Sequence, residues 1–251
     1  MIKLDAATVL LQWATGGLFF LWLTTRLRVV SAGFGWLLRG IYIVFALAAT
    51  AIGARVDAVV TRELASALVA LAATAALVVS VVRRRDNSFP PALDLVAPAI
   101  GLMGLVVAGV HAGDPALLSV ARVLIGAAFL GAVSDAMLLG HWYLVQPGLA
   151  RGPLLAMVRA VGVVWPFEVA VMLWPTGMVS VLNGSIDDGY AGLLGWFWVA
   201  CAVTTIGLVV VTRAALKERA YSAVMAATGL LYLAILTAFG TDLVARAVLA
   251  R

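Results

Sequence analysis

Charged residues, cysteine and histidine are all scarce in this chain, and each scarcity excludes a class of protein. Only 12% of its 251 residues are charged, whereas soluble domains have roughly 25%. Because there is a single cysteine, Cys201, the chain cannot form an internal disulfide framework or a multi-cysteine zinc or iron–sulfur site. It also lacks the CxxCH and HExxH motifs and a GxGxxG motif after a strand. We therefore predict no metal site, and the sequence leaves open whether the chain is an enzyme.

Long apolar stretches take the place of the missing polar surface. Hydrophobic residues make up 64% of the chain, glycine not included, and a bilayer core of about 30 Å needs about 20 such residues for each helix. Eight stretches are long enough. The sequence thus predicts an all-α, polytopic transmembrane bundle of about eight helices with short loops, forming one integral membrane domain over residues 1–251. The predicted helices are 6–24, 35–53, 63–82, 93–112, 117–145, 153–174, 191–212 and 220–249.

The net charge of +5 comes from basic residues at the ends of the predicted helices. Since they form no stripe, we expect no nucleic-acid partner. If the N-terminus is outside, the inside stretches hold most of the Lys and Arg residues, in agreement with the positive-inside rule. An even number of helices then places both termini outside. The preference for Arg over Lys, with abundant Ala, Val, Leu and Gly, is typical of a bacterial chain, so we expect the bacterial inner membrane.

Three consecutive arginines, Arg83, Arg84 and Arg85, end the third predicted helix on the inside. They are candidates for binding anionic lipid headgroups. The expected partners are membrane lipids together with other membrane subunits or further copies of this chain, because the loops are too short to form a soluble binding domain.

The fifth and sixth predicted helices form a hairpin that holds most of the ionisable residues within the membrane. Such residues are costly in lipid, so each needs a partner or a function. Antiparallel pairing about residue 149 places Arg159 about one turn to the inside of Asp135, and Glu168 a little over one turn to the outside. Each of the three can be interpreted either as a residue that is paired or anchored within the packed bundle or as part of a proton or substrate site. Trp165, close to Pro166 in the sequence, lies deep enough to line a pocket.

His141 is followed by Trp142 and Tyr143 near the inside end of the same hairpin. Together they fit either an aromatic belt at the interface or a site for a quinone headgroup or a proton. At 100° per residue, Asp135 and His141 differ by about 120°, so the candidates point into different interfaces. His111 and His141 belong to opposite membrane faces, so we expect no haem shared by these two histidines.

Other polar residues are expected at the outer face. If Ser185 caps the seventh helix, Asp187 and Asp188 fall in its first turn. Arg122 is expected to reach the outer interface, and Asp242 to pair with Arg246, four residues later.

Three functions fit these patterns. The first is a membrane subunit of a redox or bioenergetic assembly, with a quinone-headgroup or proton-transfer site in the fifth–sixth hairpin. The second is a small proton-coupled transporter or channel that uses Asp135 and Glu168. The third is a scaffold subunit without chemistry of its own.

Overall fold

The computed structural model describes residues 5–85 and 89–250, and all regular secondary structure in those ranges is helical. Eight helical spans are long and apolar enough to cross a membrane, which confirms the predicted polytopic bundle. The elements are α1 (Ala6–Thr25), α2 (Ala32–Val56), α3 (Val60–Val82), η1 (Pro91–Leu95), α4 (Val96–Ala112), α5 (Ala116–Val145), α6 (Gly152–Leu173), α7 (Gly177–Leu182), α8 (Leu193–Ala215) and α9 (Tyr221–Leu249).

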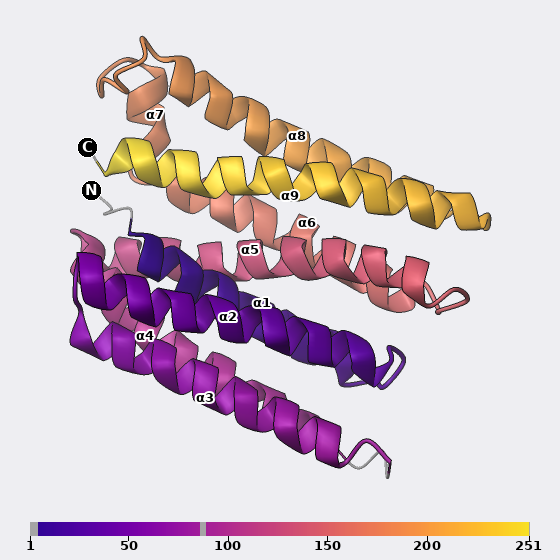
Figure 1. The fold of residues 1–251 in the computed structure, drawn as a ribbon. Coiled ribbons are helices and arrows are strands. Elements are labelled where there is room, and N and C mark those ends of the chain that lie inside the picture. The colour runs from indigo at the N-terminus through magenta and orange to yellow at the C-terminus, as the bar shows by residue number, and fades with distance from the viewer. Residues whose placement is uncertain (1–4, 86–88, 251) are drawn as a thin grey trace.

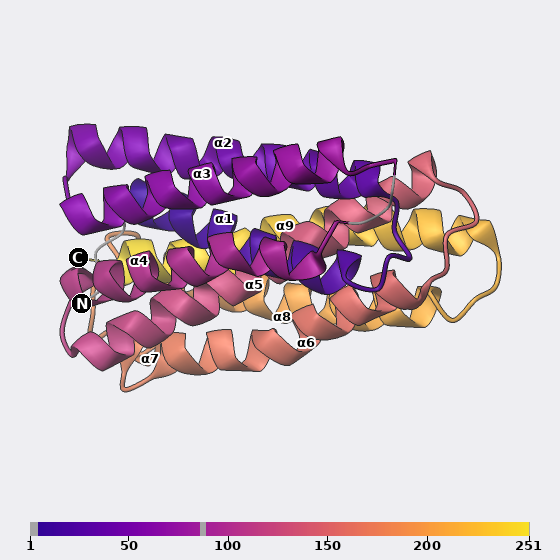
Figure 2. The same cartoon turned by 90° about the horizontal axis from the view of Figure 1, so that it is seen from below.

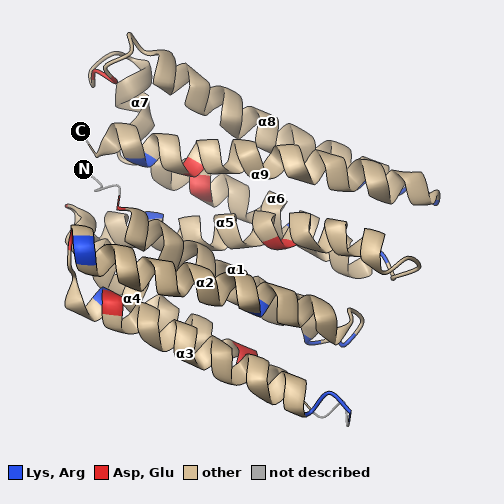
Figure 3. Ribbon diagram, in the orientation of Figure 1, with Lys and Arg blue, Asp and Glu red and all other residues tan. Residues whose placement is uncertain are grey.

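The long helices lie roughly along one axis, so their connections gather at two ends (Figures 1 and 2). One end, here called the terminal end, carries both chain termini and the α2–α3, α4–α5 and α6–α8 connections. The opposite end, here called the arginine-rich end, carries the other four connections. Basic residues in the described ranges concentrate at the arginine-rich end (Figure 3). They are Arg26, Arg28, Arg39, Arg83, Arg84, Arg85, Arg151, Arg159, Arg213, Lys217 and Arg219.

Helix α5 is the centre of the bundle, with contacts to α1, α4, α6 and α9. The α2–α3 pair lies at one edge and the α8–α9 pair at the other (Figure 1). Glycines let α1 approach α5 until the two backbones touch: a Cβ on Gly16 would lie 1.8 Å from the carbonyl oxygen of Ala127. Close backbone approach at small residues is how membrane helices gain packing energy where lipid supplies no hydrophobic drive. This contact fixes how the polar residues of α1 and α5 face each other.

Large apolar side chains cover the outside of the bundle. Met103, Leu236 and Trp196 are each about two-thirds exposed or more, at 72%, 69% and 66%. Exposed apolar surface this extensive requires lipid rather than water around the protein. The chain is therefore a multi-pass membrane protein.

The α6–α8 connection differs from the prediction. A short helix, α7, forms within it, and α8 begins at Leu193, after Asp187 and Asp188 rather than before them. Asp188 is buried and accepts hydrogen bonds from the backbone N–H groups of Tyr190, Gly192, Leu194 and Gly195, at 2.8–3.4 Å. Asp188 thus caps α8 from the preceding loop, because the loop folds back over the free N–H groups at the helix start.

Candidate functional site

A buried cluster of charged side chains joins three helices near the terminal end. It contains Glu168 of α6, Asp242 and Arg246 of α9, and Arg122 of α5, each no more than 4% exposed. Glu168 interacts electrostatically with Asp242, Arg246 and Arg122. Figure 3 shows the acidic segments of α6 and α9 next to each other inside the bundle. Counting from the helix ends, the cluster lies roughly 8–11 Å below the terminal end.

The two arginines of the cluster are fixed by different partners. Arg246 donates from Nε to Asp242 Oδ1 at 2.9 Å and from Nη2 to the carbonyl of Arg122 at 2.9 Å. The pairing of Asp242 with Arg246 is as predicted, but both residues are buried inside the bundle. Arg122 was predicted to reach the outer interface, which is wrong. It donates instead to the carbonyls of Val171 and Trp174, at 2.8 and 2.7 Å, because the last carbonyls of α6 have no partner within their own helix.

Gln12 and Gly126 complete the cluster from α1 and α5. Gln12 is fully buried and donates from Nε2 to the carbonyl of Val123 at 2.6 Å. A Cβ on Gly126 would lie 2.4 Å from Arg246 Nη2, 2.7 Å from Asp242 Oδ1 and 2.9 Å from Gln12 Nε2. Gly126 thus provides the space in which groups from α1 and α9 meet against α5.

Several oxygens of this cluster have no hydrogen-bond donor within the described residues. They are both carboxyl oxygens of Glu168, Oδ2 of Asp242 and Oε1 of Gln12. Buried oxygens are normally satisfied, because an unpaired buried polar group is costly. All four atoms are hydrogen-bond acceptors, so the cluster has more acceptors than donors.

Asp135 forms a second, separate polar contact in the middle of the bundle. Its Oδ1 accepts a hydrogen bond from the hydroxyl of Tyr42 on α2, and both side chains are fully buried. Its Oδ2 has no partner in the described chain. The neighbouring Ser134 accepts from the indole of Trp13 at 2.7 Å. Asp135 therefore joins α5 to α2.

The two carboxyl sites contact different parts of α5. The Glu168 cluster meets α5 at Gly126, nine residues from Asp135, which is roughly 14 Å along the helix. The Glu168 carboxyl faces Asp242 on α9. Arg159 is exposed near the arginine-rich end of α6, so it does not neutralise the buried Asp135.

His141, Trp142 and Tyr143 point in three directions. His141 is exposed, and its Nδ1 lies 3.2 Å from the hydroxyl of Tyr232 on α9. Trp142 packs against Phe34 on α2, with ring centroids 5.8 Å apart. Tyr143 is buried and donates to the carbonyl of Ala150. The three residues do not line one pocket, as the 100° step between successive helical residues requires.

The remaining candidates are Trp165 and the arginine triplet. Trp165 is half-buried and donates from Nε1 to the carbonyl of Ala202 on α8 at 3.0 Å, so it ties α6 to α8. The arginines 83–85 are exposed at the end of α3, a position open to lipid headgroups.

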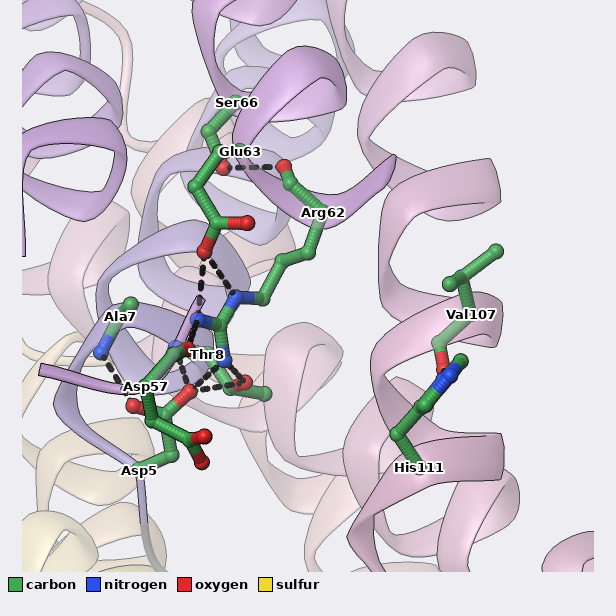
Figure 4. Close-up of polar contacts among 9 residues, drawn as sticks. All are labelled: Asp5, Ala7, Thr8, Asp57, Arg62, Glu63, Ser66, Val107 and His111. Atoms are coloured by element: carbon green, nitrogen blue, oxygen red, sulfur yellow. Dashed lines mark hydrogen bonds and ion pairs between the residues drawn. The ribbon is translucent and has the colours of Figure 1, made fainter. Parts of the chain in front are cut away.

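A further charged cluster lies at the surface of the terminal end (Figure 4). Arg62 of α3 pairs with Asp5 and with Glu63 and donates to the carbonyl of Asp57 at 2.7 Å, so it ties α1 to the α2–α3 connection. Beside it is a cavity of about 270 Å³ that His111 of α4 also lines. His111 itself contacts the carbonyl of Val107 at 2.8 Å and stands apart from the Arg62 contacts.

The two histidines lie at opposite ends of the bundle, as the topology predicted. Within the described ranges, no three His, Cys, Asp or Glu side chains form a group that could hold a metal ion.

Sequence reasoning missed Tyr42, Gln12 and the role of Arg122. Only one signal in the sequence points to them, namely a hydrogen-bonding side chain at a helical position surrounded by apolar residues. Which helix each one faces depends on tertiary packing. No protein-family model, no curated protein and no solved structure matches this chain.

Proposed function

We propose that this chain is a proton-coupled membrane transporter in which Glu168 and Asp242 together bind the coupling proton. The observation that carries the proposal is the set of four buried acceptor oxygens without a donor around these two carboxyls. A single proton placed between the carboxyls turns one of them into a donor and satisfies the other. It also removes the repulsion between two adjacent negative charges.

The surrounding residues suit a site that gains and loses one proton. Arg246 binds Asp242 directly, so Asp242 keeps a cation beside it in either state. Glu168 has no such hydrogen bond in the described residues, and it belongs to a different helix. When the proton leaves, the negative charge on Glu168 repels Asp242, which favours a separation of α6 from α9. Such a rearrangement, driven by deprotonation, opens a path for a solute between these helices.

The proton is directly observable. Infrared spectroscopy of the protein in lipid should show the C=O stretch of a buried protonated carboxyl at neutral pH. Glu168→Gln and Asp242→Asn should each remove that band, and should abolish proton uptake by proteoliposomes under an imposed membrane potential. Glu218→Gln is the control, because Glu218 is exposed at the arginine-rich end. A spectrum without the band, or proton uptake that both site variants leave unchanged, would mean that the cluster only stabilises helix packing. That result would favour the scaffold function.

A second candidate function rests on His141 and Tyr232, and it corresponds to a subunit of a redox assembly. Both side chains are exposed on the outside of the bundle, with His141 Nδ1 3.2 Å from the Tyr232 hydroxyl, and a quinone reaches its site through lipid. An imidazole and a phenol can both hydrogen-bond a quinone oxygen. If this site exists, His141→Phe should weaken the binding of a ubiquinone analogue to the protein in nanodiscs. His111→Phe, at the opposite end, should not.

We further propose that the chain resides in the bacterial inner membrane with both termini outside. The support is the charge asymmetry between the two ends. Among the described residues, the arginine-rich end holds most of the basic residues, and the terminal end holds Arg55, Arg62, Arg122 and Arg246. Arg62, Arg122 and Arg246 are buried, and each is hydrogen-bonded to a carboxylate or a backbone carbonyl. Few free positive charges therefore remain at the terminal end.

A further inference from the structure

A cavity of about 300 Å³ opens at the arginine-rich end, where the α1–α2 connection meets the start of α2, the end of α3 and η1. Arg28, Ser31, Gly35, Arg39, Ser80 and Asp94 are among the residues that line it. The cavity lies at the opposite end of the bundle from the Glu168 cluster, so it is not part of the proposed proton site. Its polar groups come from four separate segments of the chain.

Arg39 is a buried cation held in a fixed orientation. Its side chain is 3% exposed, and it donates to Asp94 from Nε at 2.8 Å and from Nη2 at 2.7 Å. Its guanidinium also lies over the ring of Phe89, 4.8 Å from the centroid. This bidentate pair uses one edge of the guanidinium. Within the described residues no acceptor bonds Nη1, which lies beside Gly35, where a Cβ would be 2.9 Å away.

Further donors surround the same space. Arg28 has a left-handed backbone, with φ of 55°, and its Nη2 donates to the carbonyl of Phe89 at 3.2 Å. Ser31 accepts from the indole of Trp142 at 3.2 Å, and Ser80 accepts from that of Trp36 at 3.0 Å. Because each hydroxyl is an acceptor in these bonds, its own proton remains available.

The charges in the cavity favour an anion. Arg28 and Arg39 each contribute a positive charge, and Asp94 contributes one negative charge that Arg39 already neutralises. We propose that the cavity binds a phosphate group, through Arg28, Arg39 Nη1 and the two serine hydroxyls. Arg39 is seven residues into α2, roughly 10 Å from the helix start. That depth is close to the membrane interface, so the phosphate can come from a phospholipid headgroup or from free phosphate in solution.

The proposal can be tested with purified protein in nanodiscs. Native mass spectrometry would count bound phosphatidylglycerol, with diacylglycerol, which lacks the phosphate, as the matched lipid. Phosphorus NMR line broadening would report binding of inorganic phosphate. Arg28→Ala removes an exposed cation, and Gly35→Ala fills the space beside Nη1. Arg26→Ala is the control, because Arg26 lies two residues from Arg28, over the Trp22 ring, and does not line the cavity.

We expect Arg28→Ala to weaken phosphate or phosphatidylglycerol binding about tenfold, the cost of losing a charge-assisted hydrogen bond. Gly35→Ala should weaken it as well, Arg26→Ala should not, and diacylglycerol should not bind. Binding of inorganic phosphate alone would support the site and identify its ligand as soluble phosphate. Equal losses in Arg28→Ala and Arg26→Ala would show general attraction to basic loops and overturn the proposal. Unchanged binding in Arg28→Ala, which is exposed and should not disturb folding, would overturn it too.

Discussion

Glu168 on α6 and Asp242 on α9 bring two carboxyl groups together in the interior of the bundle, and of these two carboxyls only that of Asp242 accepts a hydrogen bond from Arg246 within the described residues. Both acidic side chains are fully buried. A buried ion pair can gain little over an apolar pair of the same size, but a buried charge left alone is expensive. The effect of a substitution on the stability of the protein should therefore depend on which member of the cluster is removed.

Removing the cation alone should be worse than removing the ion pair. Arg246→Leu leaves Asp242 without its cation and should lower the free energy of unfolding by about 3–5 kcal/mol. The double variant Arg246→Leu/Asp242→Leu should lose less, because Asp242 is then no longer a buried carboxylate without its cation. Unfolding in mixed detergent micelles can measure both. A double variant less stable than Arg246→Leu would mean that the pair itself, not the unpaired charge, dominates the energetics.

The contact between Tyr42 and Asp135 permits a parallel test at mid-depth. Tyr42→Phe removes the donor to Oδ1, and since Oδ2 already has no partner in the described chain, neither carboxyl oxygen then has one. We expect a loss of about 1–3 kcal/mol, the cost of an unsatisfied buried group. Adding Asp135→Leu should recover part of it, because both polar partners are then apolar. If Tyr42→Phe alone leaves the stability unchanged, another donor satisfies Asp135.

The eight spans could be predicted because lipid imposes a length and a composition on each helix separately. The predicted ends differ from those of the structure by three residues or fewer, as where residues 35–53 were predicted and α2 covers Ala32–Val56. The pair of Asp242 and Arg246 was predictable for the same reason, since it depends only on the spacing within one helix.

The partners of Asp135 and Glu168 could not be predicted, because they depend on how helices distant in sequence pack. Tyr42 is 93 residues from Asp135, and Asp242 is 74 residues from Glu168. Counting residues within the fifth–sixth hairpin estimates the depth of each carboxyl in the membrane, but it does not show which helix each side chain faces. The close approach of α1 to α5 at Gly16 and Gly131 brings the N-terminal helices against α5.

Gly16 should be far less tolerant of substitution than Gly40, although both are helical. A Cβ on Gly16 would overlap the Ala127 carbonyl at 1.8 Å, whereas a Cβ on Gly40 has no atom within 4 Å. Gly16→Ala should therefore force α1 from α5 and cost at least about 1–3 kcal/mol. Gly40→Ala should be neutral or stabilise by up to about 1 kcal/mol through helix propensity. Thermal unfolding in detergent can compare them, and equal Tm values would contradict the close α1–α5 packing.

Asp188 should stabilise the start of α8 in a pH-dependent way. Burial raises the pKa of Asp188, but hydrogen bonds from the backbone N–H groups of Gly192, Tyr190, Leu194 and Gly195 lower it more, so the pKa lies below its ordinary value of 3.8. The folded state thus favours the ionised form, and this stabilisation is present above pH 3.8 and is lost as the pH falls through the lowered pKa. Asp188→Ala should lower Tm at neutral pH, and the difference from the wild type should shrink only in strong acid.

Asp187→Ala is the control for this effect, because Asp187 is exposed and its carboxylate accepts a hydrogen bond from the backbone N–H of Gly189, at 2.8 Å, rather than from the start of α8. It should change Tm less than Asp188→Ala does. A Tm difference that begins to shrink well above pH 3.8 would show that Asp188 is not stabilised as a carboxylate.

The proposed orientation can be tested by labelling single cysteines at the two ends of the bundle. In a Cys201→Ser background, Asp187→Cys marks the terminal end and Arg84→Cys marks the arginine-rich end, both at exposed positions. Because the positive-inside rule places the arginine-rich end in the cytoplasm, a membrane-impermeant maleimide should label Asp187→Cys in intact bacterial cells. Arg84→Cys should be labelled only in inverted membrane vesicles.

The reverse pattern would keep the fold and reject the orientation, since the two positions would still label from opposite sides. Labelling of both positions from the same side would contradict the number of membrane spans between them. The residues between them form α4, α5 and α6 with η1, three spans in all, and an odd number of crossings must separate the two positions. Labelling from one side would mean that one of these spans does not cross the bilayer, and the buried carboxyls of α5 and α6 would then need a different explanation.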